Sequence, residues 1–302
     1  MPIELQAVSK GNWGLNGPLN PRRKARRIAV MPTSLRIASW NLLHGGHQAN
    51  TQGQALPQPD TQRLAAAREL VGQMAPDILV INEALWCEPI DGYCAPYPAW
   101  FGFEHACKHL YDGVWGNVIL SRYPVLDCQD FMIHNRGGLL ATIQAPDGLL
   151  HVGTYHPHPG RFPHNKVSDY LDLLDFAQED IPLVLCGDFN AISPADQPDT
   201  NGLVEAFGEF SKTPAFDVAR FVDGGEAVFP ALHWAGLRDG FAPSERKITM
   251  PTRLISPSQA SGMRIDHLWV NALVQVGQAQ VVEGPLADAA SDHYPLLATV
   301  RF

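Results

Sequence analysis

Long apolar runs and an excess of positive charge are both missing from this sequence of 302 residues. No uninterrupted apolar run reaches about 18 residues, so we expect no membrane-spanning helix. The formal net charge is −9, which argues against a protein that holds nucleic acid through a broad basic surface. It does not exclude a nuclease, because acidic metal ligands would supply some of these charges and a bound cation would offset them.

Closely spaced cysteine pairs are also missing, so the sequence predicts no zinc site. Of the five cysteines, Cys186 lies in an apolar stretch and is expected to be a small buried core residue. Cys87, Cys94, Cys107 and Cys128 lie close together in the chain. One or two disulfides are expected if the protein is exported, and reduced thiols fit a cytosolic protein equally well.

The first 34 residues differ in composition from the rest, with several glycines and prolines and a basic cluster at 22–27. Only a very short apolar stretch follows that cluster, whereas a secretory signal needs a longer one. We interpret 1–34 as an extension or a partner arm, and a loosely packed solvated tail is the simpler alternative. We expect one large domain over 35–302, in a monomer, with the cytoplasm slightly favoured as its location.

The spacing of apolar residues predicts strands and helices in alternation. Asp60 is a candidate N-cap for a helix over 61–75, which Pro76 ends. Val167, Tyr170, Leu171, Leu174 and Ala177 indicate a second amphipathic helix, ending before Pro182. Strands are expected at 35–41, 77–83, 116–121, 139–144, 149–156, 183–189, 265–271 and 295–301. The pattern indicates two sheets packed face to face with helices outside.

Seven short fragments carry a family resemblance in their wording and their order. They are 36–41, 77–83, 116–124, 153–156, 185–190, 264–267 and 291–293. Together they resemble the endonuclease/exonuclease/phosphatase superfamily, the magnesium-dependent group that includes deoxyribonuclease I, abasic-site endonucleases, sphingomyelinases and inositol polyphosphate phosphatases. The resemblance implies an α+β fold, a four-layer α/β/β/α sandwich of two mainly antiparallel sheets, with the catalytic domain at 35–302.

The resemblance also implies a site for Mg²⁺, for which Mn²⁺ would substitute. It identifies Glu83 as the principal metal ligand, Asn41 as a residue that helps to place the metal and the phosphate, and Asp292 as a metal-side carboxylate. Oxygen donors suit Mg²⁺. The alternatives are a solvent-facing glutamate and a turn-forming asparagine. The family usually has glutamine before this glutamate, and here Asn82 takes its place.

Asp188 and Asn190 are two residues apart, so on an extended backbone both face the same side while Phe189 enters the core. By resemblance, Asp188 orients or deprotonates the attacking water and Asn190 binds a phosphate oxygen. The alternative is a plain turn. Asn117 and Tyr111 are further candidates for contacts near the scissile phosphate.

His293 is expected to be the acid/base group, in a turn that also brings Asp292 to the centre. By resemblance Asp266 holds its ring and stabilises the charged form. The alternative for Asp266 is a simple pair with Arg264. His156 resembles the family's second histidine, which binds phosphate or donates a proton. His151, His164 and His267 are expected to be ordinary surface or strand residues.

The expected substrate is a phosphodiester, with nucleic acid as the first choice. The aromatic residues between 86 and 103 are expected either to grip a base or a lipid or to belong largely to the core. The resemblance implies in-line hydrolysis by an activated water without a covalent intermediate. A lipid or small-molecule phosphoesterase is the first alternative, and an inactive binding module on the same scaffold is the second.

Overall fold

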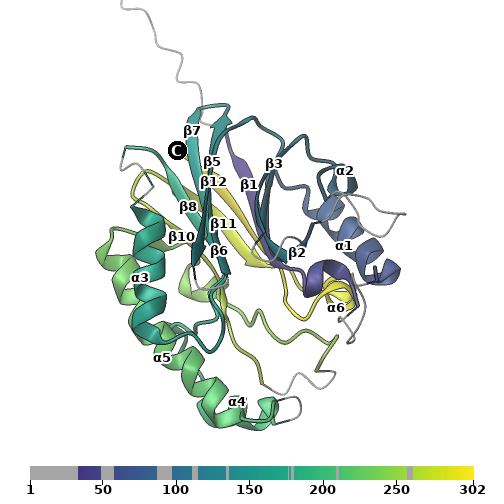
Figure 1. The fold of residues 1–302 in the computed structure, drawn as a ribbon, viewed down its shortest axis with the longest axis vertical. Coiled ribbons are helices and arrows are strands. Elements are labelled where there is room, and N and C mark those ends of the chain that lie inside the picture. Colours follow the sequence, from purple (N-terminus) through teal and green to yellow (C-terminus); the bar gives the residue numbers. More distant parts are fainter. Residues whose placement is uncertain are drawn as a thin grey trace, which may run out of the picture. The chain divides into compact units, whose positions relative to one another are not determined.

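The computed structural model describes residues 33–48, 58–86, 97–110, 115–133, 136–175, 177, 180–208, 211–256 and 261–302. The predicted extension at 1–34 therefore lies almost entirely outside the described residues, as do Tyr111, Cys87 and Cys94. The boundary at 34/35 stays a prediction. Within the described chain two six-stranded sheets are present, with helices beside them (Figure 1).

The first sheet has the strand order β11-β12-β1-β2-β4-β3 and the second has the order β5-β6-β7-β8-β10-β9. Strands β1 and β2 pair in parallel, as do β7 and β8, and the other neighbouring strands pair in antiparallel fashion. The strands of the first sheet are β1 (Leu35–Asn41), β2 (Ile78–Leu85), β3 (His105–Leu110), β4 (Trp115–Ser121), β11 (Gln275–Val281) and β12 (Leu296–Arg301). Those of the second are β5 (Val125–Ile133), β6 (Arg136–Ala145), β7 (Gly148–Tyr155), β8 (Leu183–Asp188), β9 (Arg238–Asp239) and β10 (Asp266–Val270).

The helices form the two outer layers. Figure 1 shows α1, α2 and α6 beside the first sheet and α3 and α5 beside the second. Their bounds are α1 (Thr61–Met74), α2 (Tyr97–Phe101), α3 (Pro163–Leu174), α4 (Thr200–Phe207), α5 (Pro214–Trp234) and α6 (Pro285–Ala290), and the 3-10 turns are η1 (His44–Gly46), η2 (Pro194–Asp196) and η3 (Pro243–Glu245). No helix of the described chain is long and apolar enough to cross a membrane. The predicted four-layer α+β sandwich is confirmed.

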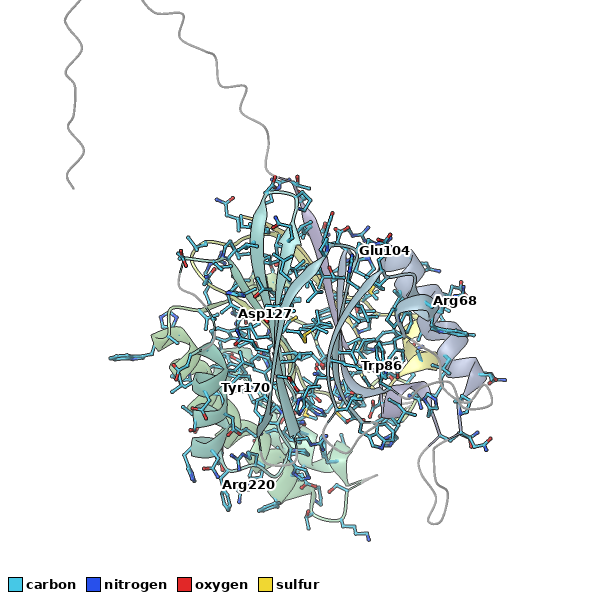
Figure 2. The ribbon with its side chains drawn as sticks, turned by 45° about the horizontal axis from the view of Figure 1, so that its top comes forward. Arg68, Trp86, Glu104, Asp127, Tyr170 and Arg220 are labelled. Carbon is cyan, nitrogen blue, oxygen red and sulfur yellow. A yellow bond between two sulfur atoms is a disulfide. The ribbon has the colours of Figure 1, made fainter. Side chains whose placement is uncertain are left out.

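Alternating side chains divide the second sheet between two cores. In β6, Leu139 and Ala141 belong to the core cluster that includes side chains of the first sheet. Leu140 belongs to the cluster that packs under α3 and α5. In β8, Cys186 joins the first cluster and Leu185 the second, as the two-residue period of a strand requires. Figure 2 shows side chains filling the space between these layers. The buried position predicted for Cys186 is confirmed.

The ends of α1 follow from local chemistry. The Asp60 carboxylate accepts hydrogen bonds from the backbone N–H groups of Gln62 and Arg63, which satisfies two of the free donors at a helix start. Ala75 adopts a left-handed conformation after the last turn, and Pro76 cannot continue the helix. Both predicted signals are therefore confirmed. The second predicted helix, α3, begins at Pro163 and ends at Leu174.

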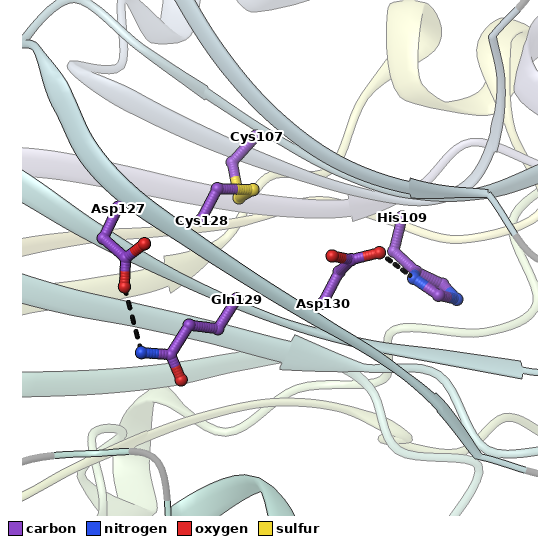
Figure 3. The surroundings of a disulfide bond; sticks show 6 residues. All are labelled: Cys107, His109, Asp127, Cys128, Gln129 and Asp130. Atoms are coloured by element: carbon purple, nitrogen blue, oxygen red, sulfur yellow. Dashed lines mark hydrogen bonds and ion pairs between the residues drawn. A yellow bond between two sulfur atoms is a disulfide. The ribbon is translucent and has the colours of Figure 1, made fainter.

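A disulfide joins the two sheets along one edge. Cys107 of β3 is bonded to Cys128 of β5, with 5.7 Å between their Cα atoms (Figure 3). Strand β3 ends the first sheet and β5 begins the second. A second link between the same strands is the 2.8 Å contact between His109 Nδ1 and Asp130 Oδ2. Of the pairings that the sequence left open, this one is formed.

Replacing both cysteines, in Cys107→Ser/Cys128→Ser, is expected to lower the free energy of unfolding by about 3 kcal/mol, because the unfolded chain regains the freedom of a loop of this length. Urea titrations of the wild type and the variant, each with and without dithiothreitol, measure the effect. Reductant should shift the midpoint of the wild type much more than that of the variant. Equal shifts in both would contradict a stabilising role for this bond.

Candidate active site

Polar residues from both sheets meet at one end of the sandwich. Asn41 ends β1, and the parallel pairing of β1 with β2 places Glu83 beside it. In the second sheet, Asp188 at the end of β8 lies directly opposite Asp266 at the start of β10. Register therefore pairs these residues within each sheet, and the packing of the two sheets brings the pairs together, as the contact between Asn41 and Asp188 shows.

Asp188 is the centre of this group. Its Oδ2 lies 3.0 Å from Asn41 Nδ2, 3.2 Å from His156 Nε2 and 3.9 Å from His293 Nε2. Its Oδ1 accepts the backbone N–H of Asn190 at 2.8 Å. Burial raises the pKa of Asp188, but the charges of His156 and His293 outweigh it and hold the pKa well below its usual range. The buried carboxylate therefore stays ionised.

The His293 ring faces Asp188 with Nε2 and contacts a second carboxylate with Nδ1. Its Nδ1 lies 2.8 Å from Asp266 Oδ2, and Trp40 Nε1 donates to its carbonyl oxygen at 2.8 Å. Burial lowers the pKa of His293, yet the carboxylates of Asp266 and Asp292 raise it well above its usual value. Asp266 thus contacts the ring and its charge favours the protonated form, while the acid/base role of His293 stays a prediction.

The alternative pairing of Asp266 with Arg264 is not formed. The Arg264 guanidinium instead donates to Asp196 at 2.8 Å and to Asp239 at 2.8 Å. The bend expected at 291–293 is present, and Ser291 Oγ ties it to β1 by donating to the Asn41 carbonyl at 2.7 Å. Together with the antiparallel pairing of β12 beside β1, this bond holds a segment from late in the chain at the site.

Glu83 and Asp292 are the carboxylates that fit a cation. Glu83 has a left-handed backbone (φ 53°) where the register of β2 shifts, which turns its side chain into the site. Its oxygens accept from Asn41 Nδ2 at 3.3 Å and from the His44 N–H at 3.1 Å, and 23% of the side chain remains exposed. Burial raises the pKa of Asp292, and the negative charge of Glu83 raises it further. Two carboxylates that repel each other in a partly open site suit a divalent cation.

Among the described residues, no three histidine, cysteine or acidic side chains form a complete metal cage. That is compatible with Mg²⁺, which is usually bound through one or two carboxylates and keeps several waters. Asn41 turns its amide nitrogen, not its oxygen, towards Glu83 and Asp188, while Asn41 Oδ1 accepts the Leu43 N–H at 3.1 Å. In this arrangement Asn41 positions the carboxylates, and its role as a metal ligand stays a prediction.

The other predicted residues lie around this centre. Asn190 Nδ2 donates to the Pro157 carbonyl at 2.9 Å, and Phe189 is buried between the two, as expected. Asn117 is fully buried and uses its amide within the protein, accepting from Asn82 and donating to the Gly137 carbonyl. Its predicted contact with substrate is therefore untested, and Tyr111 lies outside the described residues.

Asn82 connects the sheets beneath the site. Its Nδ2 donates to Asn117 Oδ1 at 2.8 Å and to Thr154 Oγ1 at 3.0 Å, and its Oδ1 accepts the Asp188 N–H at 2.8 Å. Gly187 makes room for this amide, because a Cβ there would lie 2.7 Å from both Asn82 Oδ1 and Thr154 Oγ1. The shorter side chain of Asn82 thus uses both its amide nitrogen and its oxygen in contacts within the protein.

Two buried cations near the site were missed from the sequence. Lys166 of α3 is fully buried and donates to the Asn190 carbonyl, and burial lowers its pKa to about 8. Arg63 of α1 donates to four backbone carbonyls, those of Leu42, Leu43, His47 and Ala290. A lysine or arginine in an amphipathic helix normally faces solvent, so the sequence carries no signal for either role.

The aromatic segment after Glu83 belongs mainly to the core. Tyr97, Phe101 and Phe103 are buried, and Trp86 and Trp100 pack against the same cluster. The Tyr97 hydroxyl accepts the Leu85 N–H at 2.9 Å and donates to the Gly45 carbonyl at 3.0 Å. Of the two expectations for this segment, the structure supports the core, and Tyr93 lies outside the described residues.

Acid is expected to destabilise the fold through His267. Burial among Phe189 and Phe229 lowers its pKa to about 3, whereas an unfolded histidine has a pKa of about 6.5. The folded state therefore binds fewer protons between these values, and the free energy of unfolding should fall as the pH drops through this window. In denaturant titrations, the free energy of unfolding of His267→Gln should fall less on acidification than that of the wild type or of the exposed control His233→Gln. Parallel curves would contradict this assignment.

Solved structures of other proteins share this fold. An abasic-site (AP) endonuclease from Archaeoglobus fulgidus matches with a TM-score of 0.62 at 19% identity, over 87% of this chain and 98% of that one. TDP2 from D. rerio in complex with a single-stranded DNA product matches with a TM-score of 0.58 at 16% identity, over 89% and 100% of the two chains. A mannosyl-6-phosphatase from Bacteroides thetaiotaomicron matches with a TM-score of 0.59 at 14% identity, over 89% and 100%.

At these identities the structural matches establish the fold alone. No curated protein sequence gives a significant match. The model of the Endonuclease/Exonuclease/phosphatase family matches residues 38–293, a range that includes Asn41, Glu83, Asp188, Asp266 and His293. This match spans most of the chain, and the chain therefore belongs to the endonuclease/exonuclease/phosphatase family of phosphoester hydrolases.

Proposed function

We propose that this protein is a Mg²⁺-dependent phosphodiesterase, of the nuclease type, that cleaves its substrate by in-line attack of a water molecule. The observation that carries the proposal is the buried, ionised Asp188 between His156 and His293, with Glu83 and Asp292 beside it. A carboxylate acceptor, an imidazole and a cation-binding pair in one place are the groups that phosphoryl transfer to water requires.

Asp188 accepts a hydrogen bond from the attacking water and aligns it. The low pKa of Asp188 makes it an orienting acceptor rather than a group that stores the proton, so the proton of the attacking water stays on the product phosphate and is released from it to solvent. Asn190 and His156 lie beside it to hold the non-bridging oxygens of the phosphate. His293, held by Asp266, donates a proton towards the departing oxygen.

Glu83 and Asp292 would hold the metal ion, with Asn41 positioning both Glu83 and Asp188. When bound, Mg²⁺ would supply positive charge that neutralises the phosphate and the departing oxygen. Mn²⁺ is expected to substitute, because carboxylate and water ligands suit both ions.

A nuclease is the first choice of substrate class. Two structural neighbours are described as an abasic-site endonuclease and as a complex with a single-stranded DNA product. The neighbour described as a mannosyl-6-phosphatase keeps a small-molecule phosphoesterase as the alternative. An inactive binding module is disfavoured, since a scaffold would have no need for an intact Asp188, Asp266 and His293 set.

Hydrolysis of bis-p-nitrophenyl phosphate tests the reaction class. We expect release of p-nitrophenol with Mg²⁺ or Mn²⁺ and none with EDTA. A panel of plasmid DNA, single-stranded DNA, RNA, sphingomyelin and phosphomonoesters then ranks the substrates. Turnover that survives EDTA would overturn the metal dependence, and inertness towards every diester would overturn the proposed function.

A further inference from the structure

Four planar side chains form a stacked column at the surface of α3 and α5. Phe162, the residue before α3, stacks on His164 with 6.0 Å between ring centroids and 23° between their planes. The Arg220 guanidinium lies 4.6 Å from the Phe162 centroid and 4.8 Å from the Phe216 centroid. The column therefore runs His164, Phe162, Arg220, Phe216, and both phenylalanines are 54% exposed. Arg220 is labelled in Figure 2.

This column lies close to the catalytic groups. The Phe162 carbonyl accepts the backbone N–H of Lys166, whose Nζ donates to the Asn190 carbonyl. On α5, a Cβ at Gly224 would lie 3.2 Å from Lys166 Nζ, and Arg220 precedes Gly224 by four residues. Four residues of helix rise about 6 Å, so both halves of the column lie about one helical turn from the lysine that supports Asn190.

Positive charge gathers on the same side of the site. Burial, followed by the charges of Arg136, His156 and Lys166, lowers the pKa of His158. Burial also lowers the pKa of Lys166, the charge of Asp188 opposes this, and the charge of Arg220 lowers the pKa further. In the described part of the chain, no carboxylate forms an ion pair with Arg220. Its donors are therefore available to an anion, although the protein as a whole is acidic.

Packing does not explain this arrangement. The aromatic residues after Glu83 are largely buried, whereas Phe162 and Phe216 leave half of their surfaces in water. A cation–π contact at an exposed position stabilises a fold only weakly. Aromatic rings and an arginine with free donors are, however, the groups that hold unpaired bases and their phosphates.

We propose that the stacked column of His164, Phe162, Arg220 and Phe216 is a subsite for an unpaired nucleotide of the substrate. The base stacks on the open aromatic end of the column, and the Arg220 guanidinium binds the adjoining phosphate. Bases within a duplex already stack on their neighbours, so the subsite favours single strands and frayed ends. This inference rests on the proposed phosphodiesterase function and names the form of its substrate.

Binding of a fluorescein-labelled single-stranded oligonucleotide, followed by anisotropy in EDTA, tests the subsite without catalysis. Phe216→Ala should raise Kd roughly 5- to 150-fold, the range for loss of one base stack. Phe216→Trp keeps an aromatic face and should retain binding, and Arg220→Gln should weaken binding and reduce its salt dependence. Trp234→Ala is the matched control, since Trp234 is 92% exposed at the other end of α5.

The outcomes separate this inference from the proposed function. Column-dependent binding without hydrolysis of any diester would reject the proposed function and leave the subsite standing. If the wild type hydrolyses the oligonucleotide, and Phe216→Ala has the same Kd and KM for it as the wild type, the subsite alone is rejected. The subsite would also be overturned if the protein bound a blunt duplex more tightly than a single strand. The same holds if Phe216→Ala lost binding to sphingomyelin vesicles but kept binding to the oligonucleotide.

Discussion

Asp188→Asn is expected to lower kcat at least about 10²-fold, and up to about 10⁴-fold, in a protein that remains folded. Asparagine keeps the shape of the side chain and an oxygen for the Asn190 N–H, but it removes the negative charge that faces His156 and His293. An attacking water would lose its charged acceptor. Steady-state kinetics on bis-p-nitrophenyl phosphate measures the loss.

The control for this experiment is Asp172→Asn, the same change at an exposed position of α3. It should leave kcat within about twofold of the wild type, because surface substitutions away from a site have small effects. Circular dichroism checks that both variants fold. Near-wild-type turnover of folded Asp188→Asn would remove Asp188 from the mechanism and leave His293 as the main candidate for water activation.

Asn82→Leu is expected to lower the free energy of unfolding by about 3–9 kcal/mol. Leucine fills a similar volume but leaves three buried groups without their partner: Asn117, Thr154 and the Asp188 N–H. Each group left unsatisfied in the interior costs about 1–3 kcal/mol. Urea titration measures the loss, and kcat should fall as well because Asp188 loses its backbone anchor.

A double-mutant cycle with Thr154→Val separates the hydrogen bond from general damage. The two residues lie in different sheets and are in contact, so we expect a coupling energy of at least about 0.5 kcal/mol. Additive effects would mean that Asn82 stabilises the core without connecting the sheets. The fold check here is essential, since both positions are fully buried.

Much of the fold could be predicted because most strands are short apolar runs with clear ends. The exceptions have physical reasons. Helix α5, 21 residues long, contains Gly224, Gly225 and Pro230, each of which normally argues against a helix. In the structure Gly225 meets the Ile192 backbone, which leaves no room for a Cβ. Tertiary packing thus selects residues that local propensity would reject.

The sequence does not predict the two-residue strand β9 or the longer strands β3, β5 and β11. All four lie at an edge of their sheets, and the three longer ones mix polar with apolar residues, so none reads as a buried run. A two-residue period is weak when only one face is covered and the strand carries a bulge, as β5 does between Val125 and Asp127. Edge strands such as these are therefore identified only once their pairing within the sheet is known.

The candidate site could be located from polar residues at strand ends, because register pairs them within each sheet and these ends of the two sheets pack side by side. The connections between them could not. Asn82 makes hydrogen bonds to residues of β4, β7 and β8. Lys166 of α3 donates to the Asn190 carbonyl, just after β8. Such contacts depend on which elements become neighbours, which one sequence does not reveal. The orientation of the Asn41 amide also depends on its neighbours in the fold, so the sequence alone does not predict it.

Neither sheet holds a working set of reactive groups on its own. Asn41 and Glu83 come from the first sheet, and Asp188 and Asp266 come from the second. Under the proposed mechanism, the distance between the attacking water and the cation would therefore depend on how the two sheets pack on each other. A small shift of one sheet, with helix and strand content unchanged, would then be expected to separate the two halves of the proposed site. Loss of turnover should thus be the earliest sign that this protein is loosening.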